Sequence, residues 1–212
     1  MGVLEQISEN LMKGKANEVK ALVQQAVAQK IHPGEILNKG LLSGMGTIGE
    51  RFKKNEVYVP EVLIAARAMK AGMEILKPLL AAAKVEPVGT VVLGTVKGDL
   101  HDIGKNLVGM MLEGGGFRVI DVGINVEPAK FVEEARKNNA TVIGASALLT
   151  TTMTNMKEVV LAVKASDLAG KVKVMIGGAP VTQAFCDEIG ADGYAPDAAS
   201  AADLAKKLIK AK

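Results

Sequence analysis

The residues with the clearest potential for chemistry lie in a glycine-rich turn near the middle of the 212-residue chain. The segment Gly94–Val108, GTVKGDLHDIGKNLV, contains His101, one of only two histidines in the sequence. His101 stands between Asp99 and Asp102 and directly precedes a stretch with helical spacing. An imidazole that binds a metal through one nitrogen needs a partner for its other nitrogen, commonly a carboxylate. Asp99, two residues before His101, is placed for that role.

Three interpretations of this turn compete. A phosphate-binding loop is disfavoured because its first glycine would fall at Asp99 and its hydroxyl residue is replaced by Asn106. In a purely structural interpretation, His101 and Asp102 cap a helix while Asp99 accepts backbone N–H groups. In the third, His101 binds a metal. No further His or Cys lies nearby, which argues against a zinc site built from protein alone and favours a metal that brings its own macrocycle.

The elements that must position this turn form two groups. Up to about residue 85, apolar residues recur at intervals of three and four, which predicts four helices and a small bundle. After Pro87, short β-branched runs alternate with amphipathic stretches, which predicts an α/β fold with a parallel, doubly wound sheet. We therefore expect a helical-bundle domain at 1–86 and a sheet domain at 87–212.

The expected helices of the first domain span 3–14, 16–30, 32–55 and 59–84. The expected strands of the second domain span 88–96, 118–123, 140–148, 171–178 and 192–196, and its expected helices lie near 102–115, 127–138, 152–166, 180–188 and 197–210. Ligands of such sheets bind beyond the carboxyl ends of the strands, where the strand order reverses. The turn with His101 follows the first expected strand and therefore lies where a site is expected.

Composition limits the classes of function. The net charge is +3 without a basic stripe, so we expect no nucleic-acid partner. No apolar run approaches the length of a membrane span, the first residues lack the core of a signal peptide, and Cys186 is the only cysteine. We expect a cytoplasmic protein with no membrane partner.

Three sequence elements together resemble the signature of cobalamin-binding proteins. Asp99–Gly104, DLHDIG, is similar to the D-x-H-x-x-G motif. After residues 105 to 145 comes Ser146-Ala147-Leu148 as S-x-L, and after residues 149 to 176 comes the pair Gly177-Gly178. The first motif alone is weak, but three elements at the family's spacings are specific.

The resemblance extends upstream and covers essentially the whole chain. Residues 44–78 are similar to the helical cap of cobalamin-dependent methionine synthase and of small corrinoid proteins of methyltransferase systems. The resemblance implies a four-helix bundle cap followed by a Rossmann-like, flavodoxin-like five-stranded parallel sheet. The implied cofactor is cobalamin or a related corrinoid.

The resemblance also implies roles for individual residues. His101 would be the lower axial ligand of cobalt in place of the cofactor's own benzimidazole, an arrangement called His-on and base-off. Asp99 would hydrogen-bond the distal imidazole nitrogen. Thr152, where many members carry Ser, would extend a relay that takes up and releases a proton as the ligand departs and returns.

Further residues would contact the corrinoid. Ser146, Leu148, Gly177 and Gly178 would line a slot for its nucleotide tail. The apolar side chains of Phe52 and Val59 would shield the upper face, although the family commonly has Leu at the position of Val59. The remaining expected corrinoid contacts are Gly98, Asp102, Ile103, Gly104 and Thr150.

The implied function is to carry a methyl group on cobalt, as one subunit of a methyltransferase system rather than as a complete enzyme. The implied partners are a substrate-specific methyltransferase, a methyltransferase for the acceptor, which is tetrahydrofolate or a thiol, and a reductive activator for Co(II). The methyl donor could be methanol, a methylamine, betaine or an aromatic methyl ether. Two alternatives remain: a cobalamin sensor or storage module, and the cobalamin subunit of a radical mutase, in which a helical cap has no role.

Overall fold

The computed structural model describes residues 2–210. Contacts divide the chain into two compact units. The first extends through Pro87 and includes Gly114–Gly116, and the second comprises Val88–Glu113 and the residues from Phe117 onward. The expected domain assignment at 86/87 stays a prediction.

The first unit is helical. Its helices are α1 (Val3–Met12), α2 (Ala16–Ala28), α3 (Pro33–Glu35), the π-helical η1 (Ile36–Leu42), α4 (Ser43–Lys53) and α5 (Val59–Ala82). Because α3, η1 and α4 follow one another without a break, they form one helical segment, as expected from residues 32–55. The backbone N–H of Tyr58 donates to Glu61 Oε2 at 3.0 Å, which satisfies a free donor at the start of α5.

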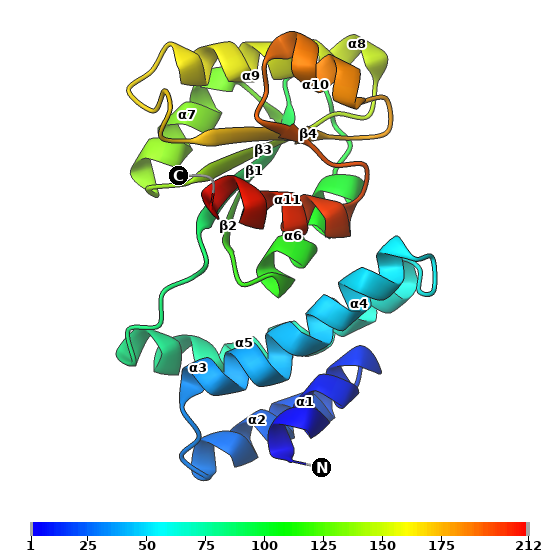
Figure 1. The fold of residues 1–212 in the computed structure, drawn as a ribbon, viewed down its shortest axis with the longest axis vertical. Helices are drawn as coiled ribbons and strands as arrows, with labels where there is room; N and C mark the ends of the chain where they lie inside the picture. The colour runs from blue at the N-terminus through cyan, green and yellow to red at the C-terminus, as the bar shows by residue number, and fades with distance from the viewer. Residues whose placement is uncertain (1, 211–212) are drawn as a thin grey trace. The chain divides into compact units, whose positions relative to one another are not determined.

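The second unit is built on a five-stranded parallel sheet (Figure 1). The strands are β1 (Thr90–Val96), β2 (Arg118–Val126), β3 (Val142–Ser146), β4 (Lys173–Gly177) and β5 (Gly193–Tyr194). Their order is β2-β1-β3-β4-β5, the flavodoxin-like order of doubly wound folds. The expected fold class is confirmed.

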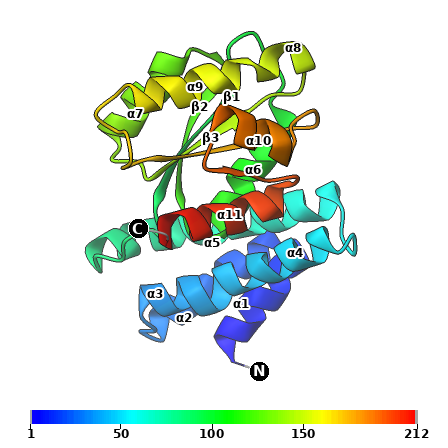
Figure 2. The same cartoon turned by 45° about the horizontal axis from the view of Figure 1, so that its top comes forward.

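Helices cover both faces of the sheet (Figures 1 and 2). On one face lie α6 (Ile103–Gly114) and α11 (Ala198–Lys210), and on the other lie α7 (Pro128–Lys137), α8 (Thr150–Met153), α9 (Asn155–Lys164) and α10 (Gln183–Ile189). Every residue of β1 is buried, because its side chains meet helices on both faces. At Gly94 a Cβ would lie 2.6 Å from Val122 and 2.9 Å from Phe131, so a larger residue there would disturb the packing of α7 on β1.

Some boundaries differ from the sequence-based expectations. The helix expected at 152–166 begins at Thr150 and is divided into α8 and α9 at Thr154. The helix expected at 180–188 begins at Gln183, because Thr182 Oγ1 accepts a hydrogen bond from the backbone N–H of Phe185 at 3.2 Å and caps the helix. The strand expected at 192–196 is reduced to Gly193–Tyr194.

Between residues 2 and 210, no helix is both long enough and apolar enough to cross a lipid bilayer.

Candidate functional site

The turn that carries His101 lies at the switch point of the sheet. β1 pairs with β2 on one side and with β3 on the other. The turn at residues 97–102 leaves the carboxyl end of β1, and residues 147–149 leave the carboxyl end of β3. The two loops are therefore neighbours at the edge of the sheet where ligands of such folds bind.

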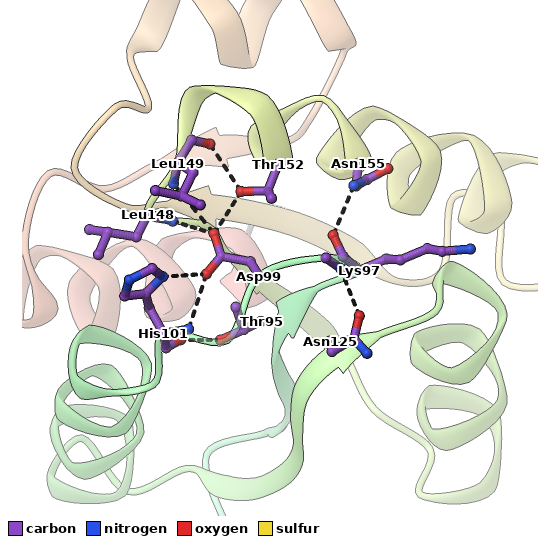
Figure 3. A network of polar contacts seen from close by, with 10 residues as sticks. Thr95, Lys97, Asp99, His101, Asn125, Leu148, Leu149, Thr152 and Asn155 are labelled. Carbon is purple, nitrogen blue, oxygen red and sulfur yellow. Dashed lines mark hydrogen bonds and ion pairs between the residues drawn. The ribbon is translucent and has the colours of Figure 1, made fainter.

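Asp99 joins these two loops through its carboxylate, which is fully buried (Figure 3). Asp99 Oδ1 lies 2.8 Å from His101 Nδ1 and accepts the backbone N–H of His101 at 3.1 Å. Asp99 Oδ2 accepts the hydroxyl of Thr152 at 2.6 Å and the backbone N–H of Leu148 at 2.8 Å. Every hydrogen bond donated to this carboxylate favours its ionised form.

The pKa of Asp99 lies well below the ordinary value of an aspartate. Burial raises the pKa of this carboxyl, but the hydrogen bonds from Thr152, Leu148 and His101 together lower it by more. Asp99 is therefore a fixed anion that serves only as an acceptor.

His101 is thereby held in one orientation and one tautomer. Because the carboxylate of Asp99 can only accept, Nδ1 carries the hydrogen, and in the neutral imidazole the lone pair is on Nε2. Thr95 Oγ1 donates to the carbonyl of His101 at 2.8 Å and fixes its backbone. The side chain is 49% exposed, and within residues 2–210 no hydrogen bond involves Nε2. The arrangement presents one nitrogen ligand.

His101 lies at a cavity of about 580 Å³ that runs along the carboxyl edge of the sheet. The loops after β1, β3, β4 and β5 and the first turns of α6 contribute its walls. Ten of the 22 lining residues are small: Gly104, Gly144, Ala145, Ser146, Ala147, Gly177, Gly178, Ala179, Ala195 and Ala201. Such a lining leaves room for an elongated group between the strands' ends.

The two glycines at the end of β4, Gly177 and Gly178, are required by the backbone as well as by the cavity. A Cβ on Gly178 would lie 1.8 Å from the carbonyl oxygen of Ala147, and its φ is +138°. A Cβ on Gly177 would lie 3.1 Å from the carbonyl oxygen of Ala195. The double glycine therefore lets the loops that follow β3, β4 and β5 approach one another.

Lys105, in the first turn of α6, lines the cavity and is almost fully buried, with 2% exposure of its side chain. Its ammonium group pairs with Asp121 of β2 and donates to Asn106 Oδ1 at 2.8 Å. The ion pair with Asp121 connects α6 to the sheet and explains the burial.

The sequence-predicted site residues fall into four groups. His101, Asp102, Ile103, Gly104, Ser146, Leu148, Gly177 and Gly178 line the cavity. Asp99 and Thr152 lie behind His101 and hold it, while Gly98 and Thr150 are exposed and outside the cavity lining. Phe52 and Val59 belong to the first unit, where Phe52 in α4 is half-buried and Val59 begins α5 with 36% exposure. Their contact with the corrinoid stays a prediction.

Sequence reasoning missed several residues of the site. Pro196 and Asp197 follow β5 and line the far part of the cavity. Asn125 at the end of β2 and Asn155 at the start of α9 hydrogen-bond the turn before His101 (Figure 3). Only the general rule that ligands bind at the carboxyl ends of strands could have indicated the residues after β5.

The donor set fits a metal that arrives within a macrocycle. Among residues 2–210, no group of three or more His, Cys, Asp and Glu side chains converges to hold a metal ion. One imidazole nitrogen held by a buried carboxylate, next to a cavity partly lined by small residues, would supply a single ligand and room for an appended tail. The fold and the site thus define a protein that binds a macrocyclic metal cofactor.

Comparisons with known proteins identify the family. The B12 binding domain family matches residues 89–203, and a second family, also described as a B12 binding domain, matches residues 3–77. Dimethylamine corrinoid protein 1 of Methanosarcina mazei is 43% identical over 211 residues, which cover 99% of this chain and 97% of that protein.

Two solved structures are similar over nearly the whole chain. A chain of the methanol:cobalamin methyltransferase complex MtaBC from Methanosarcina barkeri has a TM-score of 0.88 and 29% identity, covering 99% of this chain and 80% of that chain. A cobalamin-binding protein from Desulfitobacterium hafniense DCB-2 has a TM-score of 0.80 and 32% identity, covering 97% and 98%. The chain belongs to the B12-binding corrinoid proteins of methyltransferase systems, and its cofactor is cobalamin or a related corrinoid.

Proposed function

We propose that this protein carries a methyl group between two partner methyltransferases and holds its corrinoid His-on and base-off, through His101. The observation that carries the proposal is the 2.8 Å contact between His101 Nδ1 and Asp99 Oδ1. His101 lines the cavity, and its Nε2 makes no hydrogen bond within residues 2–210. When bound, the corrinoid supplies the cobalt that takes up and releases the methyl group.

The chain's own residues position the ligand and control its protonation. Thr152 and Leu148 hydrogen-bond Asp99 and keep it ionised, so the proton of the pair stays on His101 Nδ1. In the neutral imidazole, Nε2 then carries the lone pair that would bind the metal. A buried anion behind the imidazole also raises the basicity of the ligand.

The cavity would take the nucleotide tail that His101 displaces. Ser146, Leu148, Gly177 and Gly178 would form its walls, close to His101. Asp102 in the turn, Ile103 and Gly104 at the start of α6, and Gly98 and Thr150 would contact the corrinoid. Phe52 and Val59 would shield its opposite face.

The names of the relatives support the assignment of partners. One relative is named a dimethylamine corrinoid protein, and one similar chain belongs to a methanol:cobalamin methyltransferase complex. We infer that this protein meets a substrate-specific methyltransferase, a methyltransferase for a tetrahydrofolate or thiol acceptor, and a reductive activator in the cytoplasm. The similarity includes the helical residues 3–77, which supports a methyl carrier over a mutase subunit.

Methyl transfer can be tested with carbon-14. The protein is loaded with cobalamin, reduced, and incubated with labelled methanol, methylamines, betaine or an aromatic methyl ether, each with a methyltransferase specific for it. We expect one donor to place label on the protein in gel filtration, up to one methyl group per corrinoid. The label should leave when an acceptor methyltransferase and its acceptor are added. If no donor labels the protein, the proposed function is wrong.

A further inference from the structure

The turn before His101 is held by two asparagines that lie outside the cavity lining (Figure 3). The turn consists here of Lys97, Gly98 and Asp99. Asn155 Nδ2 donates to the carbonyl of Lys97 at 2.8 Å. The N–H of Gly98 donates to Asn125 Oδ1 at 2.7 Å, and the N–H of Asn125 donates to the carbonyl of Asp99 at 3.0 Å.

Asn125 makes both contacts from a backbone conformation that favours asparagine. Its φ is +53°, in the left-handed region that Asn and Gly adopt more readily than other residues. Gly98, its partner, has a φ of +80°. Asn125 thus binds two successive residues of the turn, Gly98 through its side chain and Asp99 through its backbone.

Asn155 contacts the turn from the side opposite to Asn125, together with Thr152 (Figure 3). Asn155 begins α9, and Thr152 lies three residues earlier in α8. Thr152 holds the side chain of Asp99 while Asn155 holds the carbonyl two residues before it. Asp99 is therefore fixed by its carboxylate from α8 and by its backbone from the end of β2. The position of Asp99 in turn sets the position of His101 Nδ1.

We propose that Asn125 and Asn155 are positioning residues that set the orientation of His101 toward cobalt and so the strength of its ligation. The inference rests on the proposed His-on binding of the corrinoid. Neither asparagine lines the cavity, so substituting them should change the placement of His101 and leave the cavity wall intact.

Four variants separate positioning from general effects on the fold. Asn125→Gly removes the side-chain acceptor while permitting a positive φ, and Asn125→Asp keeps an acceptor oxygen in the same place. Asn155→Ala removes the donor to Lys97. Asn139→Gly is the matched control, because Asn139 also has a positive φ, +49°, at the end of α7, and its side chain makes no hydrogen bond within residues 2–210.

The experiment measures how strongly His101 binds cobalt when free imidazole competes for the same position. Each protein is produced with nitrogen-15 histidine, loaded with cobalamin, reduced to Co(II) and titrated with nitrogen-14 imidazole. Electron paramagnetic resonance then shows which nitrogen isotope binds cobalt. Thermal unfolding by circular dichroism shows that each variant is folded.

We expect Asn125→Gly and Asn155→Ala to lower the imidazole concentration at half-replacement by about three- to tenfold, the range that one hydrogen bond contributes to an equilibrium constant. Asn125→Asp and Asn139→Gly should stay within about twofold of the wild type. Equal midpoints for the wild type, Asn125→Gly and Asn155→Ala would overturn the inference while leaving ligation by His101 in place. Absence of nitrogen-15 coupling in the wild type before imidazole is added would instead overturn the ligation, and this inference with it.

Discussion

Replacing Thr152 by valine should weaken the fold by removing the hydroxyl that donates to Asp99. This hydroxyl also lies 3.0 Å from the carbonyl oxygen of Leu149. The hydroxyl of Thr152 donates to Asp99 Oδ2 at 2.6 Å. This hydrogen bond is shielded from water, since Thr152 is 8% exposed and Asp99 is buried. Valine has nearly the same shape but no hydroxyl. Serine at the same position keeps the hydroxyl and lacks only the methyl group, so it is the matched control.

The expected loss of stability follows from the charge of the acceptor, the Asp99 carboxylate. A hydrogen bond to a charged group contributes about 1.5 to 3 kcal/mol. The N–H groups of Leu148 and Leu149, at 2.8 and 3.4 Å, still reach Oδ2 in the variant. We therefore expect Thr152→Val to cost about 2 kcal/mol at pH 7. Thr152→Ser should cost about 1 kcal/mol through the lost methyl group.

The loss of the hydroxyl in Thr152→Val and the loss of the methyl group in Thr152→Ser differ in their effect on the pKa of Asp99. The hydrogen bond from Thr152 helps to lower this pKa, so its loss should raise the pKa of Asp99. A lowered pKa means that Asp99 stabilises the fold above the ordinary value of about 3.9 and loses that contribution at lower pH. Thr152→Val has less of this stabilisation to lose on acidification, whereas Thr152→Ser keeps it.

Urea unfolding of the protein without corrinoid at pH 7 measures the free energies, and carbon-13 NMR of the Asp99 carboxyl follows its titration. In the wild type and Thr152→Ser we expect the carboxyl to stay ionised down to the acid limit of the folded state. In Thr152→Val the titration of the Asp99 carboxyl should move to higher pH. An unchanged Asp99 titration in Thr152→Val, or an equal loss of stability in both variants, would refute the reasoning.

Three further experiments have defined outcomes. Gly178→Ala should cost at least about 3 kcal/mol in urea unfolding, because its Cβ would lie 1.8 Å from the carbonyl of Ala147 at a φ of +138°; the control Gly170→Ala, at a φ of +71° in open space, should cost about 1 kcal/mol. Asp121→Ala should destabilise the protein by about 2 to 4 kcal/mol and Lys105→Met by less than about 1 kcal/mol, since the first leaves a buried ammonium unpaired and the second leaves a carboxylate that is 47% exposed. Equal costs would contradict this asymmetry. Cobalamin at about 100 times its Kd should add about 2.7 kcal/mol to the free energy of unfolding, and no change in the urea midpoint would mean that the folded protein does not bind it.

The fold could be predicted because its signals are local. The β-branched run that begins at Thr90 and the three- and four-residue apolar spacing of the first 85 residues each indicate one element type. Boundaries were less predictable where capping decides them, as at Thr182. The π-helical turn Ile36–Leu42 has no signal in the apolar spacing, because it changes the hydrogen-bond pattern without ending the helix.

The site was predictable where its contacts are close in sequence or belong to a spaced motif. Asp99 and His101 are two residues apart, and the structure has their contact at 2.8 Å. The contacts of Asn125 and Asn155 join residues 27 and 58 positions apart and depend on the packing of β2 and α9 around the turn. The burial of Lys105 likewise depends on Asp121, which the sheet brings to it from the neighbouring strand.

The most direct test of the account is the electron paramagnetic resonance spectrum of the Co(II) protein, produced with nitrogen-15 histidine and loaded with unlabelled cobalamin. We predict a nitrogen-15 splitting that is lost in His101→Ala and kept in His32→Ala, which changes the only other histidine. A nitrogen-14 splitting in the wild type would mean that the benzimidazole stays on cobalt, and ligation by His101 would be wrong.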